Sequence, residues 1–222
     1  MSVTSDTLAD SISGRPPAAN LRDFQIGLED TPDRLRRYRL GLALYVMSIA
    51  MLFVGFSSAY VVRRGIPIYE SATGAYSTAW EPVSLPVPLL LLNTLWLCLA
   101  SVAVEVARRR CSSQKSERNS VGWILLSLAF ALTFLVGQVA AWQKLKIGGY
   151  LLESGASAAF FYVFTGTHAF HIVLGIIFLA LVTLCHRSWR GSTRLLAVDL
   201  TAWYLHAMTL FWLYTFGFLL FA

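Results

Sequence analysis

Five long runs of apolar residues, separated by short polar segments, dominate the pattern of hydrophobic and polar positions along the chain. The runs cover about residues 40–62, 84–107, 121–142, 158–184 and 200–221, each with almost no charge in its central portion. A helix rises about 1.5 Å per residue, so about 20 such residues cross a hydrocarbon layer roughly 30 Å thick. Lipid cannot hydrogen-bond to the backbone, so each run must be helical. The pattern predicts an all-α integral membrane protein, a bundle of five transmembrane helices.

The composition supports a membrane protein: 56% of the 222 residues are hydrophobic and 14% are charged, whereas soluble domains have about 25% charged residues. The net charge of +6 does not indicate nucleic-acid binding, because the basic residues stand in short bursts between apolar runs, as lipid headgroups favour. Residues 1–30, rich in Ser, Ala, Asp and Pro, are predicted to form a mobile cytoplasmic tail before a membrane domain at 31–222. Within this tail, Leu21, Phe24 and Leu28 have the spacing of one helical face, so a short helix is the alternative to a structureless segment.

Lysine and arginine residues are distributed unequally between the two sides of the predicted bundle. The opposite side from the N-terminus has only Arg63, Arg64, Lys144 and Lys146. The basic residues on the N-terminal side are Arg34, Arg36, Arg37, Arg39, Arg108, Arg109, Arg110, Lys115, Arg118, Arg187, Arg190 and Arg194. Basic residues concentrate on the cytoplasmic side of membrane proteins. The sequence therefore predicts a cytoplasmic N-terminus and a C-terminus outside.

Polar side chains within the apolar runs are few, and such side chains usually face other helices or a partner. We predict a polar seam, or a lipid or subunit contact, formed by Asn93, Gln138, Thr165, His168, His171 and His206. His168 and His171 share a helix face because they are three residues apart. The histidines could have three roles. They could bind a metal or haem, form hydrogen bonds between helices as neutral side chains, or contact lipid headgroups or proton-linked water. Interhelical hydrogen bonding is favoured, because no Cys or carboxylate joins the histidines at a suitable depth to complete a metal site.

Two carboxylates lie near the predicted ends of helices. Glu105 precedes Arg109 by four residues, the spacing of a helical ion pair, so an interfacial ion pair is predicted and a proton-uptake carboxylate is the alternative. Asp199 is placed in the first turn of the last helix, where a carboxylate favours the helix dipole. The sequence contains no phosphate-binding Gly loop, nucleophile elbow or His-Glu zinc motif. We expect a chain that is not catalytic alone and holds no cofactor or metal itself.

One segment in the fourth run resembles the signature of a known family. Residues 165–175 read T-G-T-H-A-F-H-I-V-L-G, which is similar to the T-G-x-H-x-x-H-x-x-x-G motif of haem-copper oxidase subunit III. Leu91–Thr94 (L-L-N-T) resembles the family's L-N-T segment, and Gly137-Gln138 resembles its G-Q position. Trp203–His206 (W-Y-L-H), followed by Trp212, resembles the family's last helix. The four segments occur in the family's order, which makes the combination specific.

The resemblance extends from about Leu40 to the C-terminus and is closest to the five-helix form of this family. Three positions depart from the family pattern, which usually has carboxylates there. This chain has Ile49, Ala141 and Thr209 at these positions. Any proton-linked role that those carboxylates perform in the family is therefore in doubt here, whereas the histidines of the motif are retained.

The resemblance implies a non-catalytic subunit III of a proton-translocating haem-copper terminal oxidase in aerobic respiratory electron transport. It implies a multi-pass protein of the bacterial inner membrane that stabilises subunit I, binds phospholipid and supports proton uptake. Subunits I and II are the implied partners and carry the haem and copper, and a larger respiratory supercomplex and the electron donor are left open. A subunit-III-like accessory protein of nitric oxide reductase and a haem-carrying membrane electron-transfer protein are the alternatives, while a transporter is disfavoured by spans without charge or breaks.

Overall fold

Five long helices form the fold of this computed structural model, which describes residues 18–70, 74–77, 80, 83–112, 117–152, 155–185 and 191–221. The helices are α2 (Ala18–Gly65), α3 (Val87–Ser112), α4 (Glu117–Ile147), α5 (Ala156–Cys185) and α6 (Gly191–Phe221). Each contains a segment long and apolar enough to cross a membrane. The prediction of five apolar helices is confirmed, while the sidedness of the termini stays a prediction.

The first helix begins earlier than the predicted start of the membrane domain at residue 31. Its backbone is helical from Ala18, upstream of Thr31, and the helical spacing of Leu21, Phe24 and Leu28 fits this earlier start. The chain divides into two compact units, Met1–Gly41 and Leu42–Ala222. Residues 1–17 of the predicted mobile tail lie outside the described residues.

A small hairpin follows α2 and is the exception to the predicted all-α class. Strand β1 (Ile68–Glu70) pairs antiparallel with β2 (Ala75–Ser77), with Tyr69 opposite Tyr76. Gly74 in the turn has a φ of 65°, a conformation that glycine adopts without strain. The sequence analysis treated this segment as a loop, because strands of three residues are too short to produce a recognisable alternation of polar and apolar positions.

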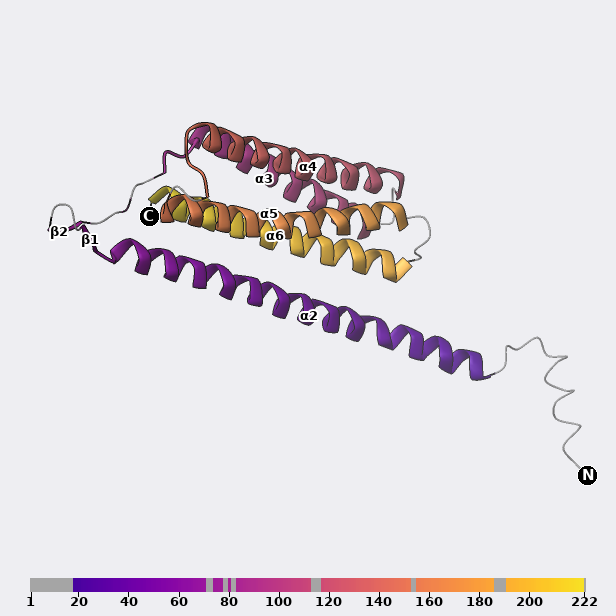
Figure 1. Cartoon of the computed structure of the whole chain (residues 1–222). Coiled ribbons are helices and arrows are strands. Elements are labelled where there is room, and N and C mark those ends of the chain that lie inside the picture. The colour runs from indigo at the N-terminus through magenta and orange to yellow at the C-terminus, as the bar shows by residue number, and fades with distance from the viewer. Residues whose placement is uncertain are drawn as a thin grey trace, which may run out of the picture. The chain divides into compact units, whose positions relative to one another are not determined.

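Helices α3 to α6 pack in a closed ring within the second unit, with α3 against α4 and α6, and α5 against α4 and α6 (Figure 1). Short connections make consecutive helices antiparallel neighbours. One half of the interior is lined by small side chains such as Ala100, Ala107 and Ala202, which allow close helix approach. The other half contains large rings such as Phe134 and Trp212. The bundle therefore combines a closely packed end with an aromatic-filled end.

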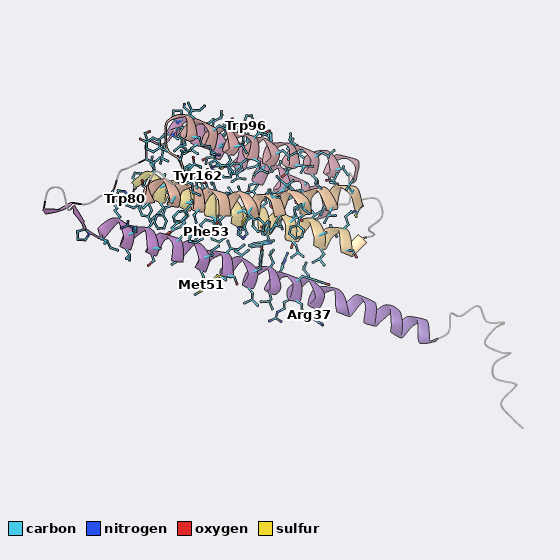
Figure 2. All side chains as sticks on the ribbon, in the orientation of Figure 1. Arg37, Met51, Phe53, Trp80, Trp96 and Tyr162 are labelled. Atoms are coloured by element: carbon cyan, nitrogen blue, oxygen red, sulfur yellow. The ribbon has the colours of Figure 1, made fainter. Side chains whose placement is uncertain are left out.

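The part of α2 from Leu42 onward reaches this ring mainly through aromatic side chains. Phe53 stacks on Phe211 of α6 with ring centroids 5.6 Å apart, and the hydroxyl groups of Ser57 and Tyr214 form a hydrogen bond of 2.7 Å. Figure 2 shows Phe53 on the side of α2 that faces α6, whereas the exposed Met51 points away. Aromatic packing and the hydrogen bond between Ser57 and Tyr214 thus help to attach α2 to the ring.

Candidate functional site

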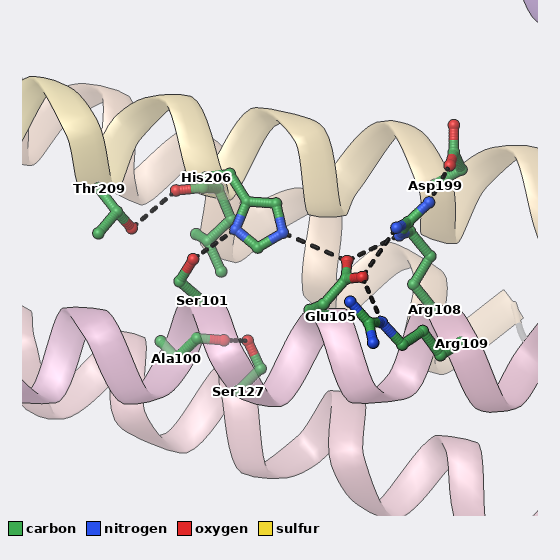
Figure 3. A network of polar contacts seen from close by, with 10 residues as sticks. Ala100, Ser101, Glu105, Arg108, Arg109, Ser127, Asp199, His206 and Thr209 are labelled. Carbon is green, nitrogen blue, oxygen red and sulfur yellow. Dashed lines mark hydrogen bonds and ion pairs between the residues drawn. The ribbon is translucent and has the colours of Figure 1, made fainter.

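The densest group of polar contacts in the described part of the chain surrounds Glu105 near the end of α3 (Figure 3). Arg108 donates from Nε to Glu105 Oε2 at 2.7 Å and from Nη2 to Oε1 at 2.8 Å. Arg109 donates from Nε to Glu105 Oε1 at 2.7 Å. Both arginines reach the carboxylate because residues three and four positions apart lie on one helix face. The carboxylate is therefore held by two guanidinium groups of its own helix.

Helix α6 completes this network from the other side. Arg108 Nη1 donates to Asp199 Oδ1 at 3.1 Å, and His206 Nε2 lies 3.4 Å from Glu105 Oε2. Ser101 Oγ and His206 Nδ1 form a hydrogen bond of 2.5 Å. Ser101 and Arg108 are two turns apart on α3, and His206 and Asp199 are two turns apart on antiparallel α6, so the two pairs meet at successive levels. We call these six residues the α3/α6 network: Ser101, Glu105, Arg108, Arg109, Asp199 and His206.

Only part of this network was visible in the sequence. The predicted pair is present, since the guanidinium of Arg109 contacts Glu105, but the stronger bidentate contact comes from Arg108, which the i+3 spacing also allowed. The position predicted for Asp199 was wrong. Helix α6 begins at Gly191, two turns before Asp199. Residues 191–199 mix polar and apolar side chains, so hydropathy alone underestimates the extent of the helix.

Four of the six residues of the predicted polar seam, Asn93, Thr165, His171 and His206, form side-chain hydrogen bonds in the structure. Asn93 Nδ2 donates to the carbonyl oxygen of Phe134 at 3.3 Å, joining α3 to α4. Thr165 Oγ1 accepts a hydrogen bond from Trp142 Nε1 at 3.0 Å, joining α5 to α4. His206 belongs to the α3/α6 network instead. Among the described residues, the hydrogen bonds of Asn93, Thr165 and His206 therefore join three different helix pairs.

His171 and Gly175 of the signature segment form a seat for Tyr204 of α6. The Tyr204 hydroxyl donates to the carbonyl oxygen of His171 at 2.9 Å. A Cβ placed on Gly175 would lie 3.2 Å from the Tyr204 ring, so only glycine allows this close approach without displacement. The His171 ring itself forms a 2.7 Å hydrogen bond between Nδ1 and the carbonyl oxygen of Thr167. His171 and Gly175 of the segment thus contribute to the packing of α5 against α6.

Gln138 and His168 are the least satisfied polar side chains in the described core. They lie at a similar level along α4 and α5, since each is one turn from the contacting pair Trp142 and Thr165. Neither the Gln138 amide nor the His168 ring has a hydrogen-bond partner, and each such buried group costs about 1–3 kcal/mol. The Trp212 ring packs on the His168 ring, with the two ring centroids 5.1 Å apart. Aromatic packing offsets part of this cost.

A close approach of two helices explains another pair of sequence segments. A Cβ placed on Gly137 of α4 would overlap the amide oxygen of Asn93 on α3. The absence of a side chain at Gly137 lets Asn93 lie against the α4 backbone and donate to Phe134. Sequence reasoning missed this contact, although a glycine inside an apolar span is a recognised signal of close helix packing.

A cavity of about 580 Å³ lies at the aromatic end of the bundle, within the usual size range of ligand pockets. It is formed by the end of α2, the segment before α3, the start of α5 and the end of α6. Its lining residues are Tyr60, Arg64, Trp80, Val83, Leu85, Val87, Ser157, Phe161, Leu219 and Leu220. Arg64 has no ion pair with any residue that the structure describes. The cavity therefore combines polar and apolar wall surface with the guanidinium of Arg64.

None of these contacts forms a metal centre within the described residues, where no three His, Cys, Asp or Glu side chains come together suitably. The groups present form hydrogen bonds and ion pairs between neighbouring helices. They position helices relative to one another and offer one amphipathic cavity. The expectation that haem and copper belong to other chains stays an expectation.

Comparisons with known proteins agree on one family. A family model described as cytochrome c oxidase subunit III matches residues 28–221. Cytochrome c oxidase subunit 3 of Cyanidium caldarium is 26% identical over 183 residues, covering 80% of this chain and 64% of that protein. The probable cytochrome c oxidase subunit 3 of Rickettsia bellii is 24% identical, with coverage of 81% and 67%. Cytochrome c oxidase subunit 3 of Mus musculus is 24% identical, covering 83% of this chain and 69% of that protein. The chain thus spans 64% to 69% of the length of these curated relatives.

Proposed function

Because the chain belongs to the cytochrome c oxidase subunit III family, we propose that it is the non-catalytic subunit III of a haem-copper terminal oxidase. The observation that carries this proposal is the signature segment, whose His171 and Gly175 seat Tyr204 between α5 and α6. The contribution of this segment to the packing of α5 against α6 supports a structural role. Its partners are then subunits I and II, which hold the haem and copper of an aerobic respiratory chain.

We propose that the chain lies in the bacterial inner membrane with its N-terminus in the cytoplasm. The distribution of lysine and arginine along the sequence supports this orientation. The α3/α6 network then lies toward the cytoplasmic side and the cavity beside Arg64 toward the outer side. Membership of a larger respiratory supercomplex is compatible with this arrangement.

Support for proton uptake by subunit I is part of the proposed role, and we assign it to packing. Ile49 and Ala141, which replace family carboxylates, are buried and apolar. The hydroxyl of Thr209 donates within its own helix, to the carbonyl oxygen of Leu205 at 2.9 Å. These positions hold no group that exchanges protons at neutral pH. The chain then supports proton uptake by stabilising the conformation of subunit I.

We further propose that the cavity at the aromatic end binds a phospholipid. Tyr60 and Trp80 pack edge-on at 4.8 Å on its wall, and aromatic residues of this kind favour the depth of the headgroups. Arg64 supplies a guanidinium for the phosphate group, and Phe161 and Leu219 offer apolar surface to an acyl chain. The arrangement matches the amphipathic shape of a lipid.

Replacing Arg64 by Gln is expected to reduce phospholipid bound to the purified chain about tenfold. A hydrogen bond to a charged group contributes about 1.5–3 kcal/mol, and 1.4 kcal/mol corresponds to a tenfold change in affinity. Mass spectrometry of lipid retained after detergent purification measures the effect. Arg63→Gln removes the same charge from an exposed neighbour that does not line the cavity, and equal loss in both variants would contradict this site.

Affinity purification of the full chain from its native membranes tests the proposed function. The purified material is examined by mass spectrometry and by a reduced-minus-oxidised spectrum. Co-purification of a haem-copper subunit I and a copper-bearing subunit II, with oxygen reduction, is the expected result. Recovery of nitric oxide reductase subunits would favour that alternative, and a lone chain with its own haem band would overturn the proposal.

A further inference from the structure

The outward face shared by α3 and α6 differs from the other outward faces of the described bundle. The exposed side chains in the middle of α4 include the apolar Leu132 and Val136, and those of α5 include Phe170 and Ile177. Such surfaces suit lipid tails. On α6, however, 36% of the His206 side chain is exposed although it lies well inside the span. Of the histidines that the structure describes, His168 and His171 are buried, so the exposed imidazole among them is on this face.

Apolar side chains surround this imidazole on both helices. We define the His206 face by its exposed members Leu95 and Val102 of α3, Trp203 and Leu210 of α6, and His206 itself. Their levels correspond, because the hydrogen bond between Ser101 and His206 fixes the register of the antiparallel helices. The face is thus an apolar strip with one polar group near its middle.

The depth of His206 makes lipid an unfavourable neighbour. His206 lies two turns along α6 from Asp199, so it is about 10 Å deeper than the ion pair between Asp199 and Arg108. Ion pairs of this kind sit at headgroup depth, which leaves His206 within the hydrocarbon layer. Ionisable side chains at that depth almost always face a bundle interior or a partner and not lipid.

A second polar group continues the face toward the headgroups. The Arg109 side chain is 77% exposed, and only its Nε is engaged, by Glu105. Its two Nη groups have no partner in the part of the chain that the structure describes. A helix lying along the His206 face would contact the imidazole of His206 and, about two turns closer to the headgroups, the guanidinium of Arg109.

We propose that the His206 face is the docking surface for a transmembrane helix of a partner subunit. Both ring nitrogens of His206 are already engaged, by Ser101 and Glu105, so that helix covers the imidazole by packing against its exposed ring. It also presents a carboxylate at the level of Arg109. Polar contacts of this type specify a partner among otherwise similar apolar helices. The inference rests on the proposed function, because it assumes a complex of membrane subunits, and it adds which face of the chain makes the contact.

Photo-crosslinking in native cells tests this surface in the full chain. Benzoylphenylalanine is introduced at Val102, which is 59% exposed on the His206 face, and at Val136, which is 70% exposed on α4. We expect an adduct between Val102 and a second membrane protein, and no protein adduct from Val136. No protein adduct at Val102, an adduct with a second copy of this chain, or equal adducts at both positions would overturn the proposal.

A pair of bulky substitutions gives an independent readout. Val102→Trp is expected to reduce the recovery of co-purified subunits at least tenfold, whereas Val136→Trp leaves it unchanged, since a ring on the docking face separates the two helices. Both variants are first required to elute as folded, monodisperse protein. If oxidase subunits co-purify with the wild type but Val102→Trp leaves them bound, the face is wrong and the proposed function stands. If the wild type recovers no oxidase subunits, the proposed function fails.

Discussion

Gly137→Ala is expected to lower the free energy of unfolding of the detergent-solubilised chain by about 2–4 kcal/mol. The new methyl group would overlap the amide of Asn93. Forcing an extra group into a packed interface costs about 1–3 kcal/mol, and moving Asn93 away loses its hydrogen bond to Phe134, about 0.5–1.5 kcal/mol. For a chain of this length the midpoint of thermal unfolding should fall by about 5–10 °C.

We attribute this loss of stability to the contact between the new methyl group and Asn93 and not to a change in helix propensity. Two further variants distinguish these two causes. Gly122→Ala lies on the same helix with no atom near its Cβ position, so it should be neutral or slightly stabilising. Adding Asn93→Ala to Gly137→Ala removes the overlapping amide and should restore part of the stability. Equal destabilisation by both glycine variants, or no rescue in the double variant, would show that the close approach of α3 and α4 does not limit stability.

Arg108→Gln is expected to have the second large effect, a loss of about 2–3 kcal/mol. Arg108 bridges Glu105 and Asp199, whose side chains are only 19% and 11% exposed. Removing one partner of a buried ion pair costs about 3–5 kcal/mol because the remaining charges lose their neutralisation. The Arg108 side chain is 35% exposed, so we place the expected loss below that range. Denaturation in mixed detergent measures it.

Arg109→Gln is the matched control for this prediction. Arg109 contacts the same carboxylate of Glu105, but its side chain is 77% exposed. An exposed ion pair contributes about 0–1 kcal/mol, so this variant should unfold almost as the wild type does. A loss as large as that of Arg108→Gln would mean that the charge on α3, and not the bridge to α6, stabilises the structure.

Both predictions describe a chain whose helices are positioned by a few specific contacts. Gly137 and Gly175 allow close approach at two helix pairs, and the α3/α6 network joins a third. The proposed role of stabilising neighbouring subunits would require this kind of rigidity. The same contacts leave His206 at the surface, where a partner helix can reach it.

The sequence by itself determined the number and kind of helices. Five apolar runs must be helical in a bilayer because lipid satisfies no backbone hydrogen bonds, and all five are present. The signature at residues 165–175 also identified the family, which the comparison confirms over residues 28–221. These features depend on local composition and on spacing along the chain, which are visible without any fold.

Only the tertiary structure decided which polar groups meet. The spacing of Glu105 and Arg109 is local and was found in advance, whereas the bridge to Asp199 depends on the rotation of α6 about its axis and its position along α3. The overlap of Gly137 with Asn93 likewise depends on how closely two helices approach. A helical period gives the faces of each helix but not the partner of each face, because that choice follows from packing side-chain volumes across the whole bundle.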